Sequence, residues 1–276
     1  MGQWDFSKSE FDAILALYIT QLRRQATADP SPCAYLTGGQ SGAGKSAFQY
    51  SPEAGLQQPC IVLDADTYRS LHPHYFAIQK KHGKEAVRQT QDFAAQFVEA
   101  LIDRLSADNY NLLIEGTLRT ADVPRETASK LREKGYRTEL LMMITKPEIS
   151  LLSTILRYEK LLTIEPALAR PTPKSHHNLI VAHLCDNLSV LYSERIFDNI
   201  RLYDRSMRLL YSQSETPDTN PASVTENALF GSWSEEELVL ARRTVEEIAS
   251  LMDARGVKNS ADRKTVAQVI KSIPGF

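Results

Sequence analysis

The chain has few cysteines, no long apolar run and almost no net charge. Its three cysteines, Cys33, Cys60 and Cys185, are odd in number and widely spaced, which excludes a disulfide framework and a close Cys-x-x-Cys metal site. No apolar run approaches the roughly 18 residues typical of a membrane span. The formal net charge of −2 provides no strong field for nucleic acid or an anionic membrane. We therefore expect no nucleic-acid partner and no membrane partner.

The start of the chain also lacks a positive segment followed by an apolar stretch, the pattern of a secretory signal. Unpaired cysteines are typical of a reducing compartment, so we expect a cytoplasmic protein. What is present is ordinary for a globular protein: 276 residues, of which 42% are hydrophobic and 24% are charged. That length suits one large domain, or one domain with a small appendage.

Strand-like and helix-like segments alternate along most of the chain. Short, nearly all-apolar segments predict buried strands at residues 33–37, 60–63, 111–114 and 138–145. Helical spacing of apolar residues predicts helices at residues 7–24, 90–105, 121–134, 148–162 and 177–194. Residues 200–203 and 207–211 predict a hairpin. Apolar strands that alternate with helices are typical of an α/β fold with a parallel sheet covered by helices on both faces.

One motif carries a specific chemistry. Residues 39–46 fit the pattern GxxxxGK[ST] at every position, between a predicted strand and a predicted helix. Glycines let the backbone curl so that several N–H groups face phosphate oxygens, and the following helix N-terminus adds positive charge. Lys45 is expected to reach the β and γ phosphates, and the Ser46 hydroxyl to ligate Mg²⁺. The predicted nucleotide-binding residues are Gly39, Gln40, Ser41, Gly42, Ala43, Gly44, Lys45 and Ser46.

The motif alone does not separate kinases from GTPases or motor ATPases, but acidic residues follow two of the predicted strands. Asp64 and Asp66 come after the second strand, and Glu115 comes after the third. Because ligands in open parallel sheets sit beyond the carboxyl ends of the strands, we expect these acids near the Lys45 loop. A carboxylate there can hold Mg²⁺ through water or accept a proton from an attacking hydroxyl. Position favours Asp66, whereas a turn-capping role is equally compatible with Asp64.

Two arginines lie in segments that could form a lid over the nucleotide site. Arg157 lies on a predicted helix and points away from its apolar stripe, and Arg170 precedes a proline-rich loop. Either could bridge the transferring phosphate oxygens as an arginine finger supplied in cis. A solvated surface arginine is the alternative for each.

Five ordered stretches of the chain resemble the zeta toxin family of bacterial toxin–antitoxin systems. They are residues 36–46, 64–75, 109–120 followed by 122–124, 156–159 and 169–174. The phosphate loop is generic, but the ordered set is specific to the family. Departures exist as well: Pro171 stands where the family usually has Ala, and Asn178 stands where it usually has Asp.

This resemblance implies an ATP-dependent toxin kinase that uses Mg²⁺. It would phosphorylate the 3′-hydroxyl of the amino sugar of UDP-N-acetylglucosamine or a related UDP-sugar and so block peptidoglycan precursor synthesis. The expected partner is a small helical antitoxin protein that covers the ATP site. The implied catalytic residues are Lys45, Asp66 as general base, Arg157 and Arg170. The implied substrate-binding residues are Asp66, Glu99, Glu115, Thr117, Arg119 and Thr127.

The residues themselves leave two other functions open. A small-molecule or antibiotic kinase on the same scaffold would carry the same phosphate loop and Asp66. A non-catalytic, nucleotide-dependent interaction module would also carry the loop. Transfer of phosphate to a defined acceptor discriminates among the three.

The C-terminal part of the chain has a different character. Residues 214–223 hold two prolines among polar residues and predict a linker. A capping box at Ser234 and Glu237 predicts a helix, and the residues beyond it are polar and weakly patterned. We therefore predict a P-loop kinase domain over residues 1–213. Residues 214–276 are predicted to form a linker and a C-terminal helical extension packed on the same domain.

Overall fold

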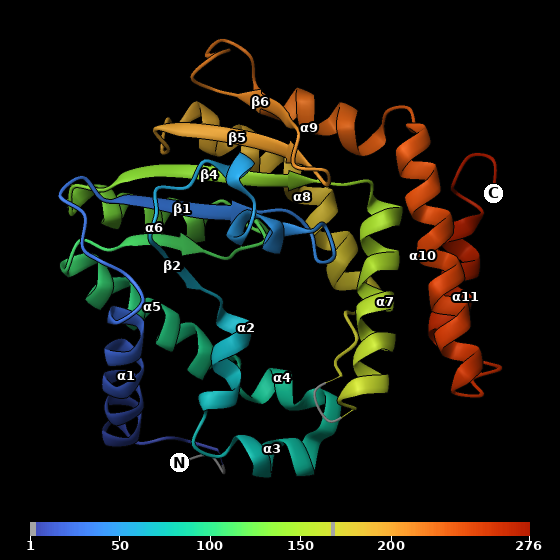
Figure 1. Cartoon of the computed structure of the whole chain (residues 1–276), viewed down its shortest axis with the longest axis horizontal. Coiled ribbons are helices and arrows are strands. Elements are labelled where there is room, and N and C mark those ends of the chain that lie inside the picture. The colour runs from blue at the N-terminus through green and yellow to red at the C-terminus, as the bar shows by residue number, and fades with distance from the viewer. Residues whose placement is uncertain (1–3, 167–168) are drawn as a thin grey trace.

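The computed structural model of the chain describes residues 4–166 and 169–276, and it is built around a six-stranded sheet with the order β2-β3-β1-β4-β5-β6 (Figure 1). The strands are β1 (Cys33–Gly38), β2 (Cys60–Leu63), β3 (Asn111–Ile114), β4 (Arg137–Ile144), β5 (Asn199–Asp204) and β6 (Leu209–Ser212). β1 to β5 run parallel, and β6 pairs antiparallel with β5. This confirms the predicted α/β fold with a mostly parallel sheet, and the predicted hairpin.

One face of the sheet is covered by long helices. They are α1 (Lys8–Arg23), α5 (Gln91–Ala107), α6 (Asp122–Glu133), α8 (Lys174–Ser193) and α9 (Pro221–Phe230). Their apolar stripes share one hydrophobic cluster with strand residues such as Leu36 and Met142. Four of the five lie where the sequence predicted helices, with ends shifted by a few residues. The fifth, α9, begins inside the predicted linker, with Asn220 as its cap and Pro221 at its first position.

In the described part of the chain, the opposite face of the sheet is covered by short helices and not by long α-helices. Tyr35 and Met143 pack there against Phe48 and Ala54. The latter two belong to short 3₁₀ helices, η1 (Lys45–Gln49) and η2 (Pro52–Ala54), and no α-helix of the described residues joins this cluster. The prediction of a regular helix after the glycine-rich loop is therefore wrong. Pro52 keeps the segment short, because it lacks an N–H and disfavours the helical conformation of Ser51, so a helix that begins at Lys45 has to end before that residue.

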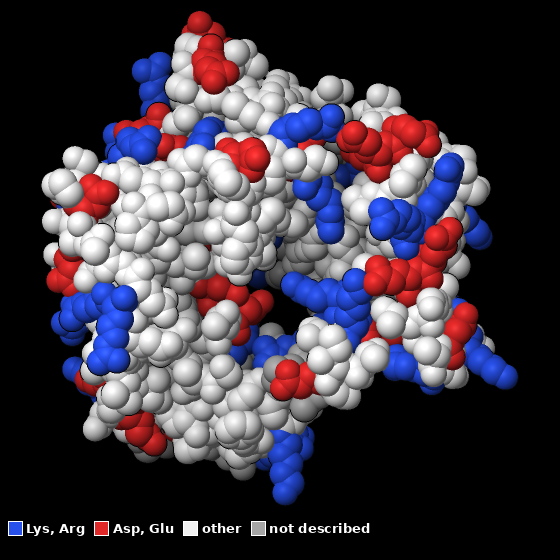
Figure 2. Space-filling model, viewed as in Figure 1, with Lys and Arg blue, Asp and Glu red and all other residues white. Residues whose placement is uncertain are grey.

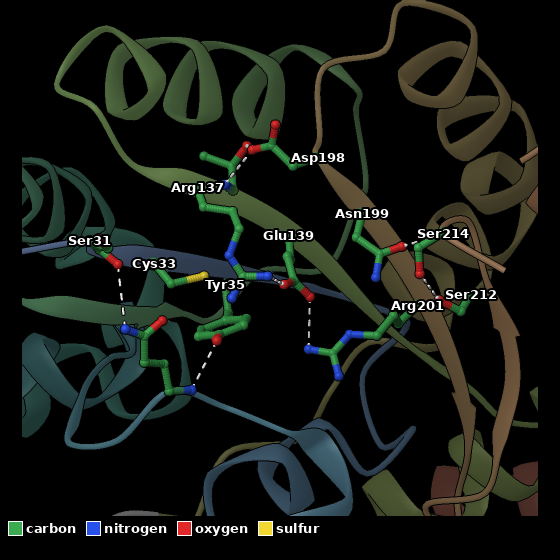
Figure 3. A network of polar contacts seen from close by, with 12 residues as sticks. Ser31, Cys33, Tyr35, Arg137, Glu139, Asp198, Asn199, Arg201, Ser212 and Ser214 are labelled. Atoms are coloured by element: carbon green, nitrogen blue, oxygen red, sulfur yellow. Dashed lines mark hydrogen bonds and ion pairs between the residues drawn. The ribbon is translucent and has the colours of Figure 1, made fainter.

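The same face of the sheet also carries a network of polar side chains (Figure 3). Glu139 of β4 is almost fully buried and pairs with Arg137 and with Arg201, whose Nη2 lies 2.8 Å from Glu139 Oε2. A buried carboxylate is costly unless it is neutralised, so the two guanidinium groups allow an acid at this position of the sheet.

Helix α7 (Pro147–Ile164) lies beyond the carboxyl ends of the strands and packs against α10 (Glu235–Ala254) and α11 (Ala261–Ile270) (Figure 1). Leu152 and Ile155 of α7, Ile248 of α10 and Val266 of α11 belong to a second hydrophobic cluster. The capping box at Ser234 begins α10, as predicted, whereas α11 was not predicted. The division of the chain at residue 213 stays a prediction.

Five short helices follow β2 and lie on the side of the molecule below β2, opposite α7 (Figure 1). They are α2 (Ala65–Tyr68), η3 (Arg69–Leu71), α3 (Tyr75–His82), η4 (Gly83–Glu85) and α4 (Ala86–Gln89). Within the described residues, no helix has both the length and the apolar character that crossing a membrane requires.

Candidate active site

The segments that follow the parallel strands line one cavity of about 550 Å³. The phosphate loop follows β1, Asp64 and Asp66 follow β2, and Glu115 follows β3. Arg157, from the helix that follows β4, completes this part of the wall. Figure 2 shows this face of the molecule hollowed near its middle, with acidic side chains on one side of the hollow and basic ones on the other. The strand-end rule therefore brings the predicted loop and acids together.

The phosphate loop is braced by the junction of β4 and α7. Gln40 Nε2 donates to the Thr145 carbonyl at 2.6 Å, and the Thr145 hydroxyl donates to the Ala43 carbonyl at 2.8 Å. Gly42 has a φ of +78°, and a Cβ there would lie 2.1 Å from the Ser150 carbonyl oxygen. The side chains of Gln40 and Ala43 are thus buried structural groups, so only their backbone is available to a nucleotide.

Lys45 lies half-buried against its own loop. Its Nζ donates to the carbonyl oxygens of Gly39 at 2.8 Å and Gln40 at 3.2 Å. Burial lowers the pKa of Lys45 to about 8, while the Glu115 carboxylate acts in the opposite direction. In this structure the ammonium donates its hydrogen bonds to two neutral carbonyl groups. Phosphate oxygens carry negative charge and would stabilise the charge of the ammonium more strongly.

The acids of the cavity differ in their partners. Asp64 caps α2 and accepts hydrogen bonds from the Asp66 N–H at 2.9 Å and the Thr67 hydroxyl at 3.1 Å, so it has the turn-capping role. The Asp66 side chain is 74% exposed, and its Oδ1 lies 2.7 Å from Arg69 Nε. Glu115 accepts from Gln49 Nε2 at 2.6 Å, and burial together with the nearby Asp64 charge raises the pKa of Glu115.

A second cavity of about 240 Å³ adjoins the first. The two share Glu115 and Thr117, and the second continues to Arg119 and Thr127. The Thr127 hydroxyl donates to a backbone carbonyl one helical turn earlier, at 2.9 Å. Glu99 lies on the exposed side of α5 and lines neither cavity. The structure therefore groups five of the six predicted substrate-binding residues around two adjoining cavities and leaves Glu99 outside them.

The two predicted arginines are placed differently. Arg157 lines the larger cavity, and its Nη2 lies 3.5 Å from the Thr172 hydroxyl. Arg170 lines neither cavity; its guanidinium donates to the Tyr75 hydroxyl and lies 5.8 Å from the centre of that ring.

Sequence reasoning missed one charged residue that the structure adds to the cavity. Arg205 lines it directly after β5 and donates from Nη1 to the Gly42 carbonyl at 2.7 Å. Its signal was its position after a parallel strand, the same rule that found Asp64, but the segment was interpreted only as a hairpin turn.

The cavity fits Mg²⁺ as a companion of bound phosphate. The Ser46 hydroxyl lines it beside Asp64 and Asp66. No three His, Cys, Asp or Glu side chains of the described residues gather closely enough to hold a metal ion by themselves. Mg²⁺ prefers oxygen ligands, which Ser46, Asp64 and Asp66 carry, and it commonly completes its shell with water and substrate phosphates.

The parallel sheet, the phosphate loop and the carboxylates at the strand ends define a P-loop protein of the kinase type. The family model of the zeta toxins matches residues 19–216, and the chain belongs to this family. Family membership and fold together support a toxin kinase.

The relatives agree over most of the chain. Toxin PezT of Streptococcus pneumoniae serotype 4 is 46% identical over 84% of this chain and 92% of its own length. Toxin zeta of Streptococcus pyogenes is 35% identical over 98% of this chain and 93% of its own length. A solved structure from the PezAT chromosomal toxin–antitoxin system of Streptococcus pneumoniae superposes with a TM-score of 0.84 at 41% identity, covering 91% of this chain and all of that one.

A more distant solved structure, the AvrRxo1-ORF1:-ORF2 complex with ATP, has a TM-score of 0.52 at 12% identity. It covers 88% of this chain and 79% of its own. At that identity the likeness concerns the fold alone.

Proposed function

We propose that the protein transfers the γ-phosphoryl group of ATP to the 3′-hydroxyl of the amino sugar of UDP-N-acetylglucosamine or a related UDP-sugar. The observation that carries the proposal is the pair of adjoining cavities in a member of the zeta toxin family. One cavity holds the phosphate loop, the other is lined by Arg119 and Thr127, and Glu115 and Thr117 lie between them. A donor and an acceptor bound in adjoining spaces can align their reacting atoms.

In the proposed reaction the sugar hydroxyl oxygen attacks the γ-phosphorus. The new O–P bond forms as the bond between the γ-phosphorus and the bridging oxygen breaks, and ADP leaves. The Asp66 carboxylate accepts the hydroxyl proton. Lys45 and Arg157, which line the cavity, offset the charge of the transferring group, with Arg170 joining them after it leaves Tyr75. Ser46 would hold Mg²⁺, which neutralises phosphate charge when bound.

The product explains toxicity and the need for restraint, since a phosphorylated UDP-sugar is withdrawn from peptidoglycan precursor synthesis. We therefore also propose a small helical antitoxin that covers the cavity and excludes ATP. A groove of about 490 Å³ supports this idea. It runs beside Arg157 along α7 and also carries Arg243. Lys160 lines it too but pairs with Glu247 at 2.7 Å, so Arg157 and Arg243 are the cations that an acidic partner helix would meet.

One incubation tests the proposed reaction. Wild-type protein and the Lys45→Ala variant are mixed with Mg²⁺-ATP and a panel of acceptors, and products are read by mass spectrometry. A gain of one phosphoryl group on UDP-N-acetylglucosamine, with wild type only, supports the proposal. Gain only on another acceptor assigns a small-molecule kinase. No transfer, but nucleotide-dependent binding of a partner protein, assigns an interaction module.

A further inference from the structure

Arg205 lies along the phosphate loop although it comes from the distant β5–β6 hairpin. Its Nη1 donates to the Gly42 carbonyl at 2.7 Å. Its Cγ lies 3.6 Å from where a Cβ on Gly44 would stand, so the side chain passes close to the loop backbone. The guanidinium therefore lies beside the glycines that shape the phosphate site.

Within the described part of the chain, no carboxylate pairs with Arg205. The neighbouring Asp204 pairs instead with Arg208 at 2.6 Å, and Arg208 also pairs with Glu236 at 3.2 Å. Burial lowers the pKa of Arg205, and no nearby acid offsets that cost. By contrast, the half-buried Arg201 has a carboxylate partner at 2.8 Å. An arginine that is partly desolvated and unpaired favours an anion as its partner.

The turn that carries Arg205 is ordered by its own hydrogen bonds. Asp204 Oδ1 accepts from the Ser206 N–H at 2.9 Å and from the Arg208 N–H at 3.0 Å. Arg205 is therefore presented from a fixed turn, and only one of the five N–H donors of its guanidinium is used by Gly42. The remaining donors are available to a ligand in the cavity that Arg205 lines.

We propose that Arg205 binds the polyphosphate of the nucleotide, as a cation beside the phosphate loop in addition to Lys45 and Arg157. This rests on the proposed nucleotide site. Arg205 also borders the groove along α7 and a cavity beside its own turn, but not the second cavity with Arg119 and Thr127. The anion that fits it at the phosphate loop is therefore the donor's phosphate and not the acceptor.

The test compares nucleotide affinity between two arginines of one hairpin. Arg205→Gln, Arg205→Lys and the control Arg208→Gln are titrated calorimetrically with AMP and with a non-hydrolysable ATP analogue, alongside thermal unfolding. Removal of a charge-assisted hydrogen bond from phosphate should weaken the analogue about tenfold to a hundredfold in Arg205→Gln. Arg205→Lys should recover part of that loss, AMP should change less, and Arg208→Gln should bind as wild type does.

Two results would overturn the proposal. One is analogue binding by Arg205→Gln at wild-type affinity. The other is an equal loss for AMP and for the analogue, which would mean that Arg205 shapes the loop or contacts the nucleoside. If the Gln variant does not fold, the Lys variant decides: it must bind the analogue more weakly than wild type does, with a smaller change for AMP. A wild-type protein that binds the analogue but does not phosphorylate UDP-sugar refutes the proposed function and leaves this inference intact.

Discussion

Lys45 is a charged group whose environment makes nucleotide binding depend on pH. Its pKa is lowered to about 8 by burial, and bound phosphates favour the protonated amine. Below pH 8 the free protein already carries the proton. Above pH 8 binding must take one up, so the affinity should fall by up to about tenfold per pH unit.

Calorimetry in buffers of different ionisation enthalpy checks this expectation. Proton uptake on nucleotide binding should rise from near zero at pH 7 to nearly one at pH 9. The Lys45→Arg variant is the control, because arginine keeps its charge across that range. Equal wild-type affinities and no uptake at both pH values would contradict the expectation.

Asp66 and Asp64 line the same cavity but have different partners: Asp64 caps α2, whereas Asp66 pairs with Arg69. Substituting each in the same way therefore gives a matched comparison. Asp66→Asn keeps the shape but cannot accept a proton, so the transfer rate should fall roughly 10²- to 10⁴-fold. Nucleotide affinity should stay close to wild type. Asp64→Asn keeps a good helix cap and should retain most of the rate. A larger loss in Asp64→Asn than in Asp66→Asn would transfer the base role to Asp64.

Among single residues, the sequence predicts those whose position follows from a motif or from the end of a strand. The phosphate loop follows from a motif, and Asp66 and Glu115 follow from their places after strands. The contact between Arg170 and Tyr75 follows from no such rule, because it joins residues 95 positions apart through tertiary packing. The position of Glu99 outside the cavities follows from no such rule either, since it depends on how α5 is oriented on the sheet.

The helix α7 is held in place by a buried ion pair as well as by apolar packing. Glu159 of α7 is 1% exposed, and Arg255 Nε, at the end of α10, donates to it at 3.0 Å. Arg157 of the cavity lies on the same helix, two positions earlier. The C-terminal helices therefore support an element of the active site.

Removing one partner of this ion pair should lower the free energy of unfolding more than replacing both partners. Arg255→Met leaves a lone buried carboxylate and should reduce the free energy of unfolding by roughly 3 kcal/mol. The double variant Glu159→Leu, Arg255→Met should recover much of that loss, because no charge remains buried. Urea unfolding midpoints of the three proteins measure both effects. A single variant within about 0.5 kcal/mol of wild type would show that the pair contributes little.

Strongly patterned elements were predictable, and elements stabilised by their neighbours were not. The strands and α1, α5, α6, α7, α8 and α10 have clear apolar periods or caps. In α11 only Val266 and Val269 are buried, a pattern too sparse to predict a helix, and their partners lie on α7 and α10. Tertiary packing supplies what the local signal lacks.

For the molecule as a whole, the segment after Gly256 contributes no side chain to the walls of the cavities at the site. Their buried side chains Val266, Val269 and Ile273 pack with α7 and α10, and none of these residues lines a described cavity. We expect the full chain to be toxic when expressed alone in a bacterial host. Truncation after Gly256 should lower the melting temperature, because it exposes the apolar side of α7 and α10. A harmless full chain with a toxic truncated chain would instead assign the restraint to this segment.

The bracing of the phosphate loop has a consequence for synthesis on the ribosome. The Gln40 side chain that holds the loop bonds to partners 105 and 110 positions later, at Thr145 and Ser150. At about 5–20 residues per second, the loop emerges several seconds to about 20 seconds before the groups that shape it. Ribosome-stalled chains that end before α7 should therefore not retain a fluorescent ATP analogue, whereas chains that expose α7 and α10 should. On this expectation a nascent toxin of this kind would bind no nucleotide until α7 is made, which would leave time for a partner to be made beside it.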